Sequence, residues 1–104
     1  MNVALFDAVT ALLLERYPGT TVKVGRVMTS LYNRHLYAGL SSRGQKVMLS
    51  FFLACRVDSP RLVNVSEPYP NRWTHHFPIA RIEDLDDEIL GWIDESWQFA
   101  MSKR

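Results

Sequence analysis

The sequence predicts an α+β fold, a two-layer sandwich in which an N-terminal and a C-terminal helix cover a four- to five-stranded, mainly antiparallel sheet. Apolar residues recur at three- and four-residue spacing at both ends of the chain, which is the period of an amphipathic helix. Between these ends, β-branched and aromatic segments alternate with short turn-like stretches, a pattern typical of antiparallel strands. Two helices with one apolar stripe each pack most simply on the same face of the sheet. The opposite face is therefore expected to meet solvent, a ligand or another subunit.

The first predicted helix covers residues 2–17, with Asn2 as its N-cap and Pro18-Gly19 as its end. The second covers about residues 85–101, and acids at its start match the helix dipole, as do Lys103-Arg104 at its end. Its apolar stripe consists of Leu85, Ile89, Trp92, Ile93, Trp97 and Ala100. The acids at its start are Asp84, Asp86, Asp87 and Glu88.

The first predicted strands lie in residues 20–40. Residues 20–32 are rich in β-branched side chains and are expected to be extended, with a bulge or break at Gly25. A turn at Asn33-Arg34 leads to a strand over residues 35–40. The composition of Ser41-Ser42-Arg43-Gly44 predicts the next turn.

The most hydrophobic segment, residues 46–56, is apolar at both odd and even positions and is predicted to be a central strand. A shorter strand is expected over residues 62–66. The prolines in Pro68-Tyr69-Pro70-Asn71 are expected to end its pairing. Residues 73–77 form the last predicted strand.

Length and composition bound the class of protein. With 104 residues and 47% hydrophobic side chains, the chain is expected to form a single domain over residues 1–104. The one cysteine, Cys55, excludes an internal disulfide and is expected to be buried and inert. No apolar run reaches the ~20 residues of a membrane span, and the N-terminus lacks the basic region of a signal peptide. We therefore expect a soluble cytoplasmic protein without a membrane partner.

Charge is distributed unevenly along the chain. Residues 1–82 contain ten Lys and Arg against four acids, a net charge of +6, whereas residues 83–104 contain seven acids against two bases, a net charge of −5. This asymmetry indicates either a surface for an anionic partner or acids gathered at one helix start.

Three stretches resemble a known family by their order and spacing. Arg26 precedes Tyr37-Ala38-Gly39 by eleven positions, Arg56-Val57-Asp58-Ser59-Pro60-Arg61 follows, and Trp73-Thr74-His75-His76-Phe77 comes before Leu85-Asp86-Asp87-Glu88. Over about residues 20–98 this arrangement is similar to the small bacterial family called domain of unknown function 5655. The resemblance implies a compact α+β domain, alone or fused to other bacterial domains, and no established activity.

The sequence departs from that family pattern at two positions. Arg26 stands where the family favours lysine, which keeps the charge but changes the geometry. Ser59 stands where a histidine is often found, which weakens any acid–base role for the Asp58-Ser59-Pro60-Arg61 corner.

The histidines and the cysteine give little support to catalysis or metal binding. His75 and His76 are adjacent on a predicted strand and point to opposite faces, so both cannot easily bind one metal ion. No zinc-type spacing, Gly-rich phosphate loop or nucleophile elbow is present, and we predict no metal and no cofactor. An enzyme that uses His75 or His76 as acid–base is kept as an alternative.

Arginines and aromatic residues on the predicted strands suggest a binding face instead. Arg26 shares strand parity with Tyr32, and Tyr37 or His35 would join them from the next strand if that face lacks helices. The candidate ligand-binding residues are Arg26, Tyr32, Tyr37, Arg56, Arg61, Trp73, His75 and His76. Such residues suit an anionic or aromatic partner, whether a small molecule, a protein or single-stranded nucleic acid.

The preferred hypothesis is therefore a non-enzymatic binding module. One alternative is a homodimer that uses the same face as its interface, with Met28 and Phe52 buried across a twofold axis. Another interpretation of the arginines is that they are solvated or pair with the acidic C-terminal helix.

Overall fold

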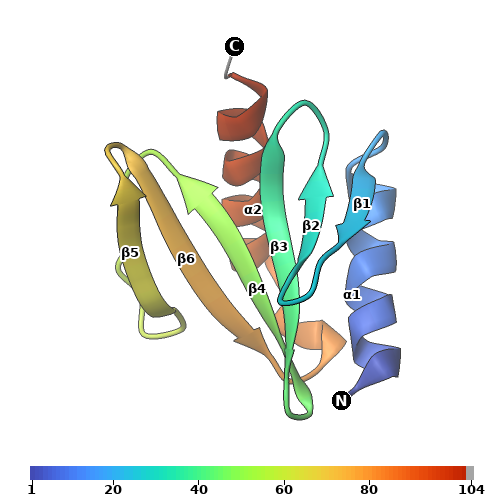
Figure 1. Ribbon diagram of the computed structural model, residues 1–104. Helices are drawn as coiled ribbons and strands as arrows, with labels where there is room; N and C mark the ends of the chain where they lie inside the picture. The colour runs from blue at the N-terminus through green and yellow to red at the C-terminus, as the bar shows by residue number, and fades with distance from the viewer. Residues whose placement is uncertain (103–104) are drawn as a thin grey trace.

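A six-stranded antiparallel sheet and two helices form the two layers of the computed structural model, which describes residues 1–102 (Figure 1). The strand order is β1-β2-β3-β4-β6-β5. The strands are β1 (Thr21–Val24), β2 (Thr29–Tyr32), β3 (Leu36–Arg43), β4 (Lys46–Leu53), β5 (Val63–Tyr69) and β6 (Arg72–Ile79). The predicted α+β fold class is confirmed, with more strands than expected.

The N-terminal helix, α1, spans Val3–Arg16 and begins as predicted. The side-chain oxygen of Asn2 accepts a hydrogen bond from the N–H of Leu5 over 3.1 Å, which satisfies one of the free N–H groups of the first turn. Beyond the helix, Gly19 adopts a φ of 86°, a conformation that glycine enters without steric cost.

The C-terminal helix, α2, spans Asp87–Met101 and starts two residues later than predicted. Asp86 is its N-cap and accepts from the N–H of Ile89. Asp84, expected in the first turn of this helix, belongs instead to a short 3₁₀ helix, η1 (Ile82–Asp84), and accepts from the N–H groups of Ala80 and Arg81. The expected closing cations, Lys103-Arg104, lie outside the described residues.

The extended segment of residues 20–32 is divided at Gly25, where a bulge or a break was predicted. Its halves, β1 and β2, form a hairpin in which Lys23 lies opposite Ser30. The N–H of Gly25 donates to the carbonyl of Met28 over 3.0 Å and closes the loop. This division explains why the sheet has six strands.

Two predicted ends of strands were wrong. β3 continues through Ser41 and Ser42, which pair with Met48 and Val47, because cross-strand hydrogen bonding outweighs the turn preference of serine. The turn comes later, at Gly44, with a φ of 61°. β4 ends at Leu53, three residues before the predicted end.

The prolines at residues 68–71 do not end the pairing of β5, contrary to the prediction. Tyr69 lies opposite Arg72, and Pro70 and Asn71 form the connecting turn, with Asn71 at a φ of 62°. β5 is an edge strand, so the missing N–H of Pro68 removes no bond to a second neighbour.

Both helices lie behind the sheet in the view of Figure 1, on the same face as predicted. The sheet side chains on that face include Leu40, Leu49 and Phe77, which belong to one buried core with residues of α1 and α2. The helical members of that core are Leu5, Val9, Leu13, Ile89, Ile93 and Ala100. No helix among residues 1–102 covers the opposite face.

No helix in the described part of the chain combines the length and the apolar character needed to cross a bilayer.

Candidate binding face

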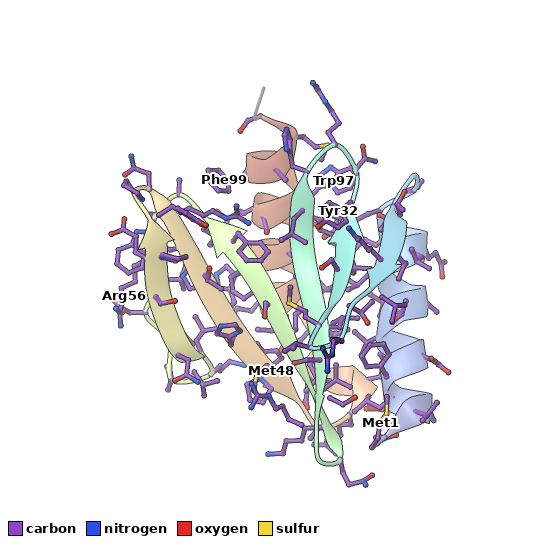
Figure 2. All side chains as sticks on the ribbon, in the orientation of Figure 1. Met1, Tyr32, Met48, Arg56, Trp97 and Phe99 are labelled. Carbon is purple, nitrogen blue, oxygen red and sulfur yellow. The ribbon has the colours of Figure 1, made fainter. Side chains whose placement is uncertain are left out.

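The uncovered face of the sheet carries the side chains that alternate with the core positions of β1–β4 and β6. Leu40, Leu49 and Phe77 are opposite one another in the core, so their chain neighbours point to the other side. We define the uncovered face by these residues: Lys23, Ser30, Tyr32, Gly39, Ser41, Arg43, Lys46, Met48, Ser50, Phe52, Arg72, Thr74, His76 and Pro78. Figure 2 shows Met48 on the side of the sheet toward the viewer, with Trp97 and Phe99 on α2 behind it.

Charge is segregated between the two layers. β1–β4 and β6 contain no acidic residue, and their cations Lys23, Arg43, Lys46 and Arg72 all belong to the uncovered face. No ion pair within residues 1–102 joins one of these four to an acid. The acidic residue of β5, Glu67, accepts a hydrogen bond from the N–H of Asn71.

Three arginines outside the uncovered face form ion pairs, whereas Arg26, Arg34 and Arg81 form none within residues 1–102. Arg16 on α1 forms an ion pair with Asp94 over 2.7 Å. Arg61 contacts Asp86 and Glu88 at the start of α2, over 2.9 Å each. The positive charge that is left without acidic partners therefore includes that of the uncovered face.

His76 and Ser50 form a polar pair near the middle of the uncovered face. The Nδ1 of His76 lies 2.8 Å from the hydroxyl oxygen of Ser50, its partner on β4. Burial, and to a lesser degree the charge of Arg43, lowers the pKa of His76. The other ring nitrogen, Nε2, has no hydrogen-bond partner among the described residues, so a neutral imidazole can present it to a ligand.

Phe52 and Arg72 form a stacked pair at one end of the face. The guanidinium carbon of Arg72 lies 4.6 Å from the centre of the Phe52 ring, within the range of a cation–π contact. Phe52 is only 7% exposed, and the guanidinium lies over its ring.

The loop between β1 and β2 lies against the uncovered face over β3. A Cβ atom at Gly39 would lie 2.3 Å from the Sδ of Met28, so the methionine side chain rests directly on the glycine backbone. Figure 1 shows this loop crossing in front of β3. The loop therefore bounds the open part of the face on the side of β1 and β2.

A comparison with known families gives one match. The chain matches the family model described as Domain of unknown function (DUF5655) over residues 1–100. The chain belongs to this family. The match includes α1, which the sequence resemblance over residues 20–98 did not. Neither the curated proteins nor the solved structures contain a significant match.

Among the residues expected at the site of this DUF5655 domain, Tyr32 and His76 lie on the uncovered face. Arg26 is exposed in the loop between β1 and β2 rather than on a strand. It lines a shallow hollow of about 480 Å³ with residues of that loop, β3 and the start of α1, including Met1 and Phe6.

Tyr37 does not lie on the uncovered face, and its expected place there was wrong. It is fully buried, its ring contacts Tyr17 and Trp97 at centroid distances of 5.2 and 5.1 Å, and its hydroxyl lies 2.9 Å from the hydroxyl of Thr20. The register of β2 and β3 shifts at Tyr32, so Leu36 takes the opposing position and Tyr37 turns to the core.

His75 and Trp73 also belong to the helix-facing side. His75 is fully buried and stacks on Phe51, so the prediction that His75 and His76 point to opposite faces is confirmed. Trp73 is partly exposed at the start of β6, with the guanidinium carbon of Arg56 5.8 Å from its ring.

Two further predicted ligand contacts have partners within the chain. Arg56 forms an ion pair with Asp58 over 2.7 Å, and Arg61 pairs with α2, as the alternative interpretation of the arginines required. Cys55, expected to be buried, is exposed, because β4 ends before it.

Four polar members of the face were not predicted from the sequence: Lys23, Arg43, Lys46 and Ser50. The signal that could have found them was strand parity. Arg43 and Lys46 flank the turn at Gly44 and must lie opposite each other in the β3–β4 hairpin. Among the described residues no group of three or more His, Cys, Asp and Glu side chains is placed to hold a metal ion.

Proposed function

We propose that this DUF5655 domain is a non-enzymatic binding module that recognises an anionic partner on the uncovered face. The observation that carries the proposal is the gathering of Lys23, Arg43, Lys46 and Arg72 on one face, where none of them has an acidic partner among residues 1–102, whereas Arg16 and Arg61 are paired with acids of α2 and its N-cap. Arg and Lys side chains form their strongest hydrogen bonds with carboxylate and phosphate oxygens. A partner that supplies such oxygens would gain these contacts without first breaking an ion pair.

The same charges disfavour a homodimer through this face. A twofold axis would place the cations of one copy against those of the other, with no acid on five of the six strands to offset them. Like charges brought together at an interface oppose association. An anionic partner is therefore the better occupant.

The arrangement of the histidines favours binding over acid–base catalysis. His75 and His76 lie on opposite faces and cannot act on one substrate. In a serine–histidine pair built for catalysis, Nε2 faces the serine and a third group holds Nδ1. Here Nδ1 of His76 faces Ser50, and Nε2 is left to donate to an anion.

A titration with short-chain inorganic polyphosphate tests the proposal, followed by amide chemical shifts of the ¹⁵N-labelled protein. We expect shifts in β1–β4 and β6 with little change in α1. The double substitution Arg43→Gln, Arg72→Gln should weaken binding at least tenfold at 50 mM salt.

The matched control is the double substitution Arg56→Gln, Arg81→Gln, which removes the same charge away from the uncovered face. Equal weakening by the control, or no binding by the unaltered protein at 50 mM salt, would overturn the proposal. A dimer that forms through this face, detected by light scattering and the same amide shifts, would also overturn it and support the homodimer.

A further inference from the structure

The uncovered face is open mainly over two strands. Met28 and its loop lie on Gly39 of β3, and β5 forms the far edge of the sheet, so the free surface runs along β4 and β6. We call this surface the β4–β6 strip. Its central members are Met48, Ser50 and Phe52 of β4, with Thr74, His76 and Pro78 opposite them on β6.

Cations lie at both ends of the strip. Lys46 begins β4, and Arg43 lies opposite it on β3. Leu53 pairs with Trp73, so Arg72 lies eight positions beyond Lys46 along the strand, a distance of about 27 Å at the rise of an antiparallel strand. A single phosphate or a small dicarboxylate cannot contact both ends. An extended polyanion can.

Hydrogen-bonding groups occupy the middle of the strip. The hydroxyl of Thr74 and the free Nε2 of His76 lie between the charged ends, and the buried hydroxyl of Ser50 holds the Nδ1 of His76. Hydroxyl and imidazole donors of this kind contact phosphate and sugar oxygens in nucleic-acid complexes.

Aromatic and guanidinium planes distinguish a nucleic acid from an acidic peptide. The stacked pair of Phe52 and Arg72 lies on the strip, and Tyr32 lies two strands away in the neighbouring part of the face. Unpaired bases stack on aromatic rings and on guanidinium planes, whereas the carboxylates of an acidic peptide do not stack on them.

The lack of a projecting helix or ribbon in the described part of the chain favours a single strand over a duplex. Reading of a duplex requires a helix or a ribbon that enters a groove, and no such element projects from the uncovered face within residues 1–102. A sheet surface instead contacts bases that are already unstacked.

From these observations we infer that the β4–β6 strip binds an extended single strand of nucleic acid. Its phosphates lie against Arg43, Lys46 and Arg72, and its bases stack on the guanidinium plane that Phe52 supports and lie over His76. This inference rests on the proposed function and names the class of partner.

Fluorescence anisotropy with labelled oligothymidylates of two, four and eight nucleotides tests the inference. Affinity is expected to rise from two to eight nucleotides. With about three phosphates neutralised, it should fall roughly 20-fold between 50 and 200 mM salt. A duplex of the same length should bind at least tenfold more weakly.

Two substitutions separate stacking from charge. Phe52→Leu keeps an apolar side chain and is expected to weaken binding of the eight-nucleotide strand at least fivefold, with binding of polyphosphate unchanged. Arg72→Gln should weaken both. Arg81→Gln removes the same charge elsewhere and should weaken neither, and amide spectra verify that each variant is folded.

The failures can be told apart. If polyphosphate or poly-glutamate binds at least as tightly as the eight-nucleotide strand and Phe52→Leu has no effect, the single-strand inference is overturned while the proposed function stands. Equal binding of the duplex also overturns it. If none of these polyanions binds at 50 mM salt, both proposals fail.

Discussion

The Nε2 atom of the His75 imidazole accepts a hydrogen bond from the backbone N–H of Val57 over 3.0 Å. The bond fixes the β4–β5 connection to β6 and requires a neutral ring with its proton on Nδ1. Burial lowers the pKa of His75, the nearby charges of Arg56 and His76 lower it further, and the carbonyls of Trp73 and Phe51 offset this only in part. Protonation would replace the acceptor by a second donor and break the bond.

Stability is therefore expected to fall under mildly acidic conditions. Because the folded pKa of His75 lies below its ordinary value of 6.5, the unfolded chain takes up the proton first as the pH falls. The contribution of the neutral His75 to the free energy of unfolding is complete above pH 6.5 and is lost as the pH decreases toward the folded pKa. The free energy of unfolding in urea at pH 7.5 and at pH 5.5 measures this loss.

Two variants assign this dependence on pH. His75→Gln keeps an acceptor for Val57 without a titrating group, so its stability should change less between the two pH values. His76→Gln removes the second histidine that has a lowered pKa. This histidine also makes the protein less stable as the pH falls, so its removal should reduce the pH dependence of stability. An unchanged pH dependence in His75→Gln would contradict the assignment.

Ser96 of α2 is expected to be the most costly serine to replace. Its hydroxyl donates to the carbonyl of Tyr37 over 2.6 Å and accepts from the N–H of Phe52 over 2.9 Å, where the β3–β4 ladder ends. Ser96→Ala would leave both buried groups without a partner, at a cost of about 2–4 kcal/mol. Urea unfolding measures the cost against Ser102→Ala, an exposed serine. Equal costs for the two would show that the bridge contributes nothing.

The contact between Met28 and Gly39 predicts a coupled pair. Gly39→Ala forces the methionine away from the sheet and should cost about 1–2 kcal/mol. In a Met28→Ala background the three nearest atoms that the new Cβ would meet are gone and the change restricts the unfolded chain, so it should be neutral or stabilising. A double-mutant cycle measures the coupling, and strictly additive effects would contradict the contact.

Asp94 of α2 accepts hydrogen bonds from two neighbouring residues at the end of α1, and these two donors differ in their exposure to solvent. The guanidinium of Arg16 and the hydroxyl of the buried Tyr17 both donate to it, and these bonds, that of Arg16 first, hold the pKa of Asp94 below its usual range. Tyr17→Phe should cost about 1–2 kcal/mol. Arg16→Ala breaks a partly exposed ion pair and should cost less than about 1 kcal/mol. Urea unfolding in low and high salt checks the order, since only the Arg16 effect should diminish with salt.

Local patterns were sufficient for the helices and for the layer arrangement. The spacing of apolar residues and the capping residue Asn2 placed α1 correctly, and two stripes placed both helices on one face. The alternation of a strand was also enough to separate His75 from His76. These features depend on residues that are close together in the chain, so the sequence alone was enough to predict them.

Features that depend on contacts between distant segments could not be predicted in this way. The register shift that turns Tyr37 inward is set by pairing with β2 and by packing on Trp97. Pro68 was not predicted to lie in a strand. The edge of the sheet tolerates this proline, but the position of β5 at the edge follows only from the strand order. The pairing of Arg61 with α2 depends on how the β4–β5 connection crosses to the helix layer.

The division of acids and bases between the helix layer and the uncovered face gives the molecule an electric dipole across its thickness. A net charge of +1 conceals this polarity. At one pH and low salt, the sheet side should adhere to a sulfonate resin and the helix side to a quaternary-ammonium resin. Retention on either column would then report which side faces the matrix rather than the total charge of the protein.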